Sequence, residues 1–117
     1  MRMLLFSTLP IALLAAPAQG EVLRTMPHGP YECTLPGDAA GPAIIPLPDA
    51  SFTVTRASRY RTAAGRGTYL LKGDTLTFSG GPKNGQRLRR TGPNELRAIN
   101  PDGSNGRMIC VRTGSNY

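Results

Sequence analysis

Residues 65–81, GRGTYLLKGDTLTFSGG, decide the fold that this sequence predicts. Two runs rich in β-forming residues flank the dipeptide Gly73-Asp74, and glycine supplies the positive φ that a two-residue hairpin turn requires. With that dipeptide as the turn, residues equally far from it on the two strands face each other. One side of the hairpin then carries the large apolar residues Tyr69, Leu71, Leu76 and Phe78. The other side carries Thr68, Lys72, Thr75, Thr77 and Ser79, with Leu70 as its apolar member. A slip of one residue would scatter the apolar set, so this register is specified.

Short alternating segments recur on both sides of this hairpin, separated by residues that favour turns. We expect these further strands at 31–35, 51–60, 86–91, 95–100 and 107–112. Ser51–Tyr60 reads as one strand with Arg56 as an odd polar member of its inner face. Three prolines exclude a central strand from Ala40–Asp49 and predict an edge strand or a covering loop. Residues 61–67 are expected to turn the chain into the hairpin.

The hairpin expected around Gly92-Pro93-Asn94 has two possible registers. A three-residue loop sets Arg89 opposite Arg97 and places four residues on one side: Leu88, Arg90, Leu96 and Ala98. A four-residue loop pairs Arg90 with Glu95 instead. Apolar packing favours the first register and charge favours the second, so the sequence leaves both open.

The first twenty residues have the layout of a secretory signal peptide. A positive start is followed by an apolar run that is short for a membrane span, and small residues then appear at cleavage spacing. Cleavage after Gly20 would leave one domain, residues 21–117, with its ordered part at about 30–113. The stretch Glu21–Gly29, which holds the lone histidine His28, is expected to be a loosely held arm.

Export predicts an oxidising compartment, periplasmic or secreted, in which Cys33 and Cys110 form a disulfide. The two cysteines lie in the first and last expected strands, so a bridge between them would hold those strands together. No helical period follows the signal peptide, and strands recur roughly every eight to twelve residues. We therefore expect an all-β antiparallel meander, a closed barrel of about 6–8 strands, with a β-sandwich as the alternative.

The composition is basic, with 14 Lys and Arg against 7 Asp and Glu and a net charge of +7. In an exported protein this favours anionic polymers, lipid head groups or an acidic protein partner over nucleic acid. Four arginines on the 86–100 hairpin form the candidate anion-binding surface: Arg87, Arg89, Arg90 and Arg97. Four more precede the central hairpin: Arg56, Arg59, Arg61 and Arg66. Protection of exposed strand edges is the alternative explanation of these charges.

The sequence predicts no enzyme, no cofactor and no metal site. A catalytic triad needs a histidine held by packing and by a third group, and His28 lies in the expected loose arm. Most carboxylates occupy turns, where backbone geometry explains them. Two bridging cysteines and one histidine are too few for a tetrahedral zinc site.

Several spaced motifs resemble small exported proteins of α-proteobacteria. They are Tyr31-Glu32-Cys33, Phe52-Thr53-Val54, Ser58-x-Tyr60, Gly67-Thr68-Tyr69, Gly73–Phe78 with Ser79-Gly80-Gly81, and Cys110-Val111-Arg112. This resemblance implies a shared β fold and no catalytic residue. A weaker similarity, through the Tyr-x-Cys start and the bridging cysteine, is to periplasmic inhibitors of c-type lysozyme. The inhibitory Ser-Gly-rich loop of that family is absent in its usual form, and the positive charge opposes binding to a basic lysozyme.

The sequence therefore predicts an exported non-catalytic binding or structural module that contacts anionic envelope components through arginines. Inhibition of a lysozyme-like or other hydrolase is the second hypothesis. The third is binding of a small apolar ligand inside the barrel by the inward aromatic side chains, with a packed core as the simpler explanation.

Overall fold

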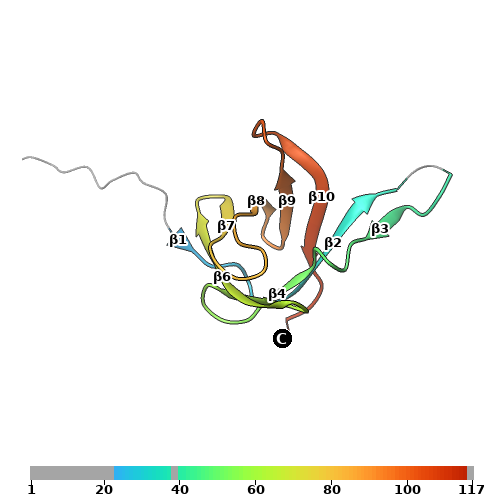
Figure 1. Cartoon of the computed structure of the whole chain (residues 1–117). Helices are drawn as coiled ribbons and strands as arrows, with labels where there is room; N and C mark the ends of the chain where they lie inside the picture. Colours follow the sequence, from blue (N-terminus) through green and yellow to red (C-terminus); the bar gives the residue numbers. More distant parts are fainter. Residues whose placement is uncertain (1–22, 38–39, 116–117) are drawn as a thin grey trace, which may run out of the picture.

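The computed structural model describes residues 23–37 and 40–115, which form strands and turns with no helix (Figure 1). The strands are β1 (Leu23–Arg24), β2 (Gly29–Pro36), β3 (Ile44–Pro46), β4 (Phe52–Val54), β5 (Arg59–Thr62), β6 (Gly65–Lys72), β7 (Thr75–Phe78), β8 (Arg87–Gly92), β9 (Glu95–Ile99) and β10 (Asn105–Arg112). The expected signal peptide lies outside the described residues. Within them, no helix is long and apolar enough to cross a membrane.

Eight of these strands close into an antiparallel barrel. The order around the ring is β6, β5, β4, β2, β10, β9, β8 and β7, and β7 pairs with β6 again. Strand β1 adds to β6, and β3 adds to the far end of β2, so these two strands lie outside the ring. Figure 1 shows β2 and β3 extending together away from the barrel. The closed barrel is confirmed over the sandwich, and the proline-rich segment supplies an edge strand as expected.

The β6–β7 hairpin has the register that its sequence predicts. Lys72 is paired with Thr75 and Tyr69 with Phe78, so Gly73-Asp74 is the turn, and Gly73 has a φ of 58°. The four apolar side chains of its inner face are buried, whereas Leu70 on the outer face is 41% exposed. Strand β8 continues this wall because Leu88 is paired with Leu76.

Aromatic side chains fill the interior of the barrel. Tyr31 stacks on Phe52 with ring centroids 5.3 Å apart, and Phe78 meets the rings of Phe52 and Tyr60 edge-on at 5.2 and 4.7 Å. Leucines from β6 to β9 complete the core. The interior of an eight-stranded barrel is just wide enough for side chains to fill it. These mutual contacts support the packed-core explanation of the aromatic residues, while an internal apolar ligand stays a prediction.

The seam between the first and last strands of the ring carries the disulfide. Cys33 on β2 and Cys110 on β10 are directly paired across the two strands and are bonded to each other. On its other side Cys33 lies where β2 changes partner from β4 to β3. There the Ser51 hydroxyl accepts the Cys33 amide proton at 3.0 Å, and the Leu47 amide donates to the Cys33 carbonyl at 2.8 Å. The predicted bridge is therefore confirmed, and it closes the barrel.

The expected strand over 51–60 is wrong, because the chain turns within it. Strands β4 and β5 are joined by residues 55–58, and the Arg59 amide donates to the Arg56 carbonyl at 2.9 Å. Arg56 is therefore exposed in a turn and does not lie on an inner face. Ala57 takes a φ of 50°, the only positive value outside glycine among the described residues. Residues 61–67, expected as a turn, contain the end of β5, a two-residue loop and the start of β6.

The stretch before β2 is packed, which contradicts the expectation of a loose arm for residues 23–29. The Met26 side chain is 1% exposed, and the Met26 amide donates to the Tyr69 hydroxyl at 2.8 Å. The Tyr31 hydroxyl donates to the Pro27 carbonyl at 2.7 Å. A single buried methionine gives no periodic signal in a sequence, which is why this contact could not be predicted.

The β8–β9 hairpin adopts the register favoured by packing. Leu88 is paired with Ala98 and Arg89 with Arg97, and an irregularity between Arg90 and Gly92 accommodates the extra residue. Burial of Leu88 and Leu96 thus outweighs the repulsion between the two arginines.

Candidate anion-binding sites

The structure divides the four arginines expected to form one anion-binding surface. Arg87 and Arg89 alternate with the buried Leu88 and therefore lie on the outer face of β8, with Arg97 of β9 directly opposite Arg89. Arg90 belongs to the other face of β8. One of its guanidinium nitrogens lies 3.8 Å from an Asp74 carboxylate oxygen, and its amide donates to the Asp74 carbonyl. Three of the four residues share a face, and Arg90 fastens β8 to the β6–β7 turn.

Arg89 also has a partner within the protein. Its two terminal nitrogens donate to the Asn105 side-chain oxygen at 2.5 Å and to the Gly103 carbonyl at 2.9 Å. These bonds hold the loop between β9 and β10. Of the predicted surface, Arg87 and Arg97 remain with no hydrogen bond or ion pair from their side chains to another described residue.

The other four arginines converge on a hollow of about 330 Å³ at the β4–β5 turn and the β5–β6 hairpin. The residues that line it are Thr55, Arg56, Arg59, Tyr60, Arg61, Arg66 and Gly67. Arg59 and Arg61 alternate with buried Tyr60 and share the outer face of β5, and Arg66 of β6 is paired directly with Arg61. The β4–β5 turn brings Arg56 to the same place. The β4–β5 turn and the short β5–β6 loop therefore bring the four arginines together in one site.

The hollow is electrostatically unbalanced. No acidic residue lines it, and none of its four guanidinium groups makes an ion pair or hydrogen bond to another described residue. Four arginines elsewhere in the described residues do make a hydrogen bond or an ion pair within the protein: Arg89, Arg90, Arg107 and Arg112. Like charges placed directly opposite each other on a sheet are destabilising. An external anion would relieve this repulsion, so the arrangement is chemically suited to bind one.

Hydrogen bonds fix the walls of the hollow. The Tyr60 hydroxyl donates to the Gly80 carbonyl at 2.7 Å and accepts the Lys83 amide proton at 2.9 Å. The Tyr69 hydroxyl donates to the carbonyl of Ala57, in the turn between Arg56 and Arg59, at 3.0 Å. Burial raises the pKa of Tyr69, so this hydroxyl keeps its proton at neutral pH.

Gly67 lines the hollow at a position where no side chain fits. A Cβ atom there would lie 2.2 Å from the Gly80 carbonyl oxygen and 2.7 Å from the Tyr60 ring. Ala57 sits in the left-handed region, which costs a residue with a Cβ roughly 1–2 kcal/mol. Strain of this kind recurs at ligand-binding sites, where the surrounding structure holds it in place.

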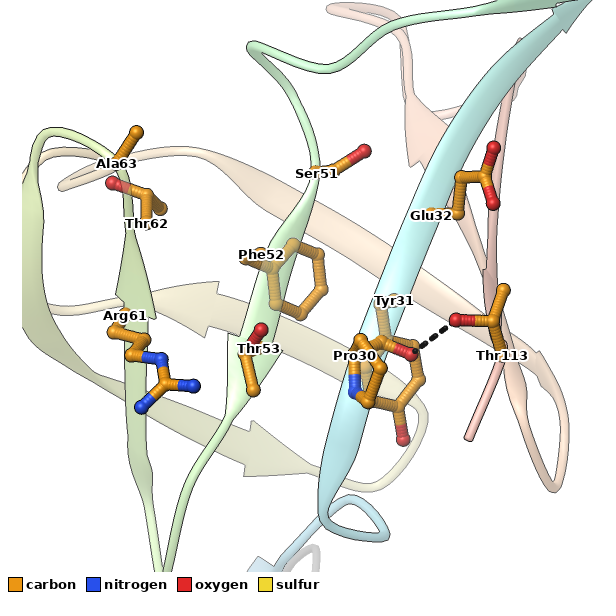
Figure 2. Close-up of a pocket in the computed structure, with 10 residues that line it drawn as sticks. All are labelled: Pro30, Tyr31, Glu32, Ser51, Phe52, Thr53, Arg61, Thr62, Ala63 and Thr113. Carbon is orange, nitrogen blue, oxygen red and sulfur yellow. Dashed lines mark hydrogen bonds between the residues drawn. The ribbon is translucent and has the colours of Figure 1, made fainter. Parts of the chain in front are cut away.

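A larger and shallower hollow of about 470 Å³ lies on the outer face of β2, β4 and β5. Figure 2 shows Arg61 on one side of it and Glu32 on the other, with Thr53 and Pro30 between them. The Thr113 hydroxyl donates to the Pro30 carbonyl at 3.4 Å at the same edge. Because it carries charges of both signs, this hollow has no clear preference for an anion. Arg61 lines both hollows.

The described residues contain no group of three His, Cys, Asp or Glu side chains that could hold a metal ion. The Arg112 side chain donates a hydrogen bond to the His28 carbonyl at 2.7 Å, and this bond ties the segment before β2 to β10. Burial raises the pKa of Tyr31 to about 12, against the opposing effect of Arg112, so its hydroxyl remains a proton donor.

Sequence reasoning named Arg56, Arg59, Arg61 and Arg66 but did not predict that they converge. Gly65 was the available signal, because a two-residue loop before it places Arg61 opposite Arg66. The contribution of Arg56 depends on the 55–58 turn, which contains neither glycine nor proline.

Comparison of the chain with protein-family models, curated proteins and solved structures finds no match.

Proposed function

We propose that the protein is an exported, non-catalytic module that binds an anionic component of the cell envelope through its arginines. The observation that carries this proposal is the hollow where four arginines meet without an acidic residue. The chain as a whole is strongly basic, with a net charge of +7. Such a concentration of unpaired positive charge raises the local concentration of anions and speeds their association.

The rest of the fold supports a module that works outside the cytoplasm. The barrel is closed by a disulfide, a bond that persists in oxidising compartments. Its interior is packed with apolar side chains, so the exposed arginines stand on a rigid frame. A rigid frame lowers the entropy cost of binding, because the side-chain roots do not have to be ordered first.

The proposal differs from the sequence-based prediction in the surface it uses. The β8–β9 face contributes Arg87 and Arg97, but Arg89 and Arg90 have partners within the protein. The β5–β6 hollow gathers four guanidinium groups, none of which has a partner among the described residues. We therefore place the main contact at the hollow and a weaker one on the β8–β9 face.

Retention on an anionic resin and on immobilised lipopolysaccharide tests this function. Arg59→Gln/Arg61→Gln/Arg66→Gln removes three charges at the hollow. The matched control, Lys72→Gln/Arg87→Gln/Arg97→Gln, removes three charges elsewhere on the surface. The first variant should elute at clearly lower salt than the second, although both have the same net charge. Equal elution of the two variants, or no retention of the unmodified protein, would contradict the proposal.

A further inference from the structure

We infer that the arginine hollow at the β4–β5 turn and the β5–β6 hairpin is a binding site for a phosphate monoester. This inference rests on the proposed function and names the ligand chemistry of the same site. It draws on the directions from which the arginines approach, the size of the hollow and the absence of any other charged group from its lining.

The arginines reach the hollow from different sides. Arg61 and Arg66 stand opposite each other on neighbouring strands, with Cβ atoms about 5 Å apart in such pairs. Arg59 is two residues from Arg61 on the same face, and Arg56 comes from the turn beyond the strand end. A group bound in the hollow would lie within reach of guanidinium groups from β5, from β6 and from the β4–β5 turn.

A phosphoryl group fits this arrangement better than a carboxylate. A carboxylate has two oxygens in one plane, and one guanidinium fork satisfies both of them. A phosphate monoester presents three terminal oxygens in a tetrahedral arrangement and carries up to two negative charges. Several arginines can therefore each bind it with little competition, and bidentate arginine–phosphate contacts are among the strongest hydrogen bonds in proteins.

The volume of the hollow, about 330 Å³, lies at the small end of ligand pockets. It admits a phosphoryl group with a small part of the molecule that carries it. Thr55 and Gly67 line the remainder. A soluble sugar or glycerol phosphate and the head group of a phosphomonoester lipid share this chemistry.

The state of the ligand sets the pH dependence of this site. Arginine stays charged throughout the accessible range, and the Tyr60 hydroxyl in the lining is held by Gly80 and by the Lys83 amide. Of the neighbouring charged groups, the Lys83 amine lies over the Phe52 and Phe78 rings, and Glu32 lies across the other hollow from Arg61. A phosphate monoester loses its second proton near pH 6, so binding should strengthen as the pH rises from 5 to 7.5.

Isothermal titration of the purified, disulfide-bonded protein at low ionic strength tests the inference. Glycerol 3-phosphate should bind saturably and about tenfold more tightly at pH 7.5 than at pH 5, because only about a tenth of it is dianionic at pH 5. Sulfate should show no such pH dependence, and acetate should not saturate. Vesicles with and without phosphatidic acid distinguish a lipid source of the phosphate from a soluble one.

Variants locate the site. Arg61→Gln/Arg66→Gln should weaken glycerol 3-phosphate binding by about tenfold or more, since two charge-assisted contacts are lost. Arg61→Lys/Arg66→Lys keeps the charge but loses the forks and should give an intermediate loss. The control Arg24→Gln/Lys72→Gln removes two exposed charges outside both arginine surfaces and should bind as the unmodified protein does. A thermal melt checks that each variant is folded, which is expected because the substitutions lie on the exposed face.

Failure of this inference is distinguishable from failure of the proposed function. Polyanion retention that depends on the hollow, combined with no saturable phosphate binding or with phosphate binding independent of pH, overturns the phosphate site alone. If the unmodified protein shows neither polyanion retention nor phosphate binding, both proposals are overturned. An equal loss in the hollow variant and in the control overturns the assignment to the hollow.

Discussion

Two hairpins, β5–β6 and β8–β9, each place one arginine directly opposite another, but the protein surrounds the two pairs differently. Arg89 of the Arg89–Arg97 pair donates to Asn105 and Gly103 and so holds the neighbouring loop. The Arg61–Arg66 pair makes no comparable contact within the described residues. The same like-charge repulsion is thus partly offset by internal hydrogen bonds in one hairpin and left unrelieved in the other. The difference separates an arginine that builds the fold from arginines available to an external anion.

Removal of the disulfide tests whether both hairpins depend on one closed frame, and it has the largest expected effect. The bridge joins β2 to β10, so the hollow lies on one side of this seam and the β8–β9 face on the other. Closing a loop between cysteines 77 residues apart is worth up to about 4.5 kcal/mol. Chemical denaturation of Cys33→Ala/Cys110→Ala should show a loss approaching this value. Reduction of the unmodified protein is the control, and an unchanged midpoint in both would contradict a structural role for the bridge.

Tyr69→Phe should disturb the hollow and leave the β8–β9 face intact. The Tyr69 hydroxyl joins the buried Met26 amide to the Ala57 carbonyl in the 55–58 turn. Its removal leaves the amide unpaired, at a cost of about 2 kcal/mol. NMR amide shifts should change around Arg56 and Arg59 but not around Arg89. Tyr31→Phe is the matched control, since its hydroxyl bonds only the Pro27 carbonyl. Shifts that spread equally to both hairpins would break the distinction.

Alkaline pH should weaken the same side of the barrel through its tyrosines. Burial raises the pKa of Tyr31 from 10 to about 12 and raises that of Tyr69 as well. The unfolded chain loses these protons near pH 10, while the folded protein still holds them. The contribution of these two tyrosines to the free energy of unfolding is therefore constant below pH 10 and falls as the pH rises from 10 toward 12. Denaturation midpoints at a series of pH values should show this fall, and Tyr31→Phe should reduce it. A midpoint independent of pH across that window would oppose this account.

Arg89→Met should cost about 1 kcal/mol, because it removes two hydrogen bonds that hold the β9–β10 loop. Methionine keeps the unbranched stem, so the loss reports the guanidinium contacts. Arg97→Met removes the opposite member of the pair and is the control. Urea denaturation should show a loss for the first variant and little change for the second. Equal effects would mean that the loop does not depend on Arg89.

How far the sequence predicted this molecule follows from the kind of signal each element carries. The β6–β7 register was predictable because apolar residues alternate on both strands around a glycine turn. The 55–58 turn was missed because Ala57 takes a left-handed conformation without a glycine, and a hydroxyl from β6 holds it there. Such a contact joins residues 12 apart and leaves no local pattern.

The candidate site shows the same limit. The sequence grouped arginines by segment, which joined Arg90 to Arg87 and Arg89, although strand alternation places Arg90 on the other face. Arg90 contacts Asp74 across the sheet, and that pairing depends on the order of strands around the ring. The arginines of the hollow were visible as residues, but their convergence needed the missed turn.

Arg66→Gln gives the smallest effect and the most direct test of the comparison. It removes one member of the Arg61–Arg66 pair, so it should raise the free energy of unfolding by about 0.3 kcal/mol at low salt. The gain should vanish near 1 M salt, where the screening length falls to about 3 Å. Arg87→Gln is the matched control, because Arg87 faces Thr77 and its removal relieves no directly opposed charge. Thermal melts at low and high salt provide the measurement. A destabilised Arg66→Gln at both salt concentrations would mean that this arginine also builds the fold, and the two hairpins would then no longer differ in kind.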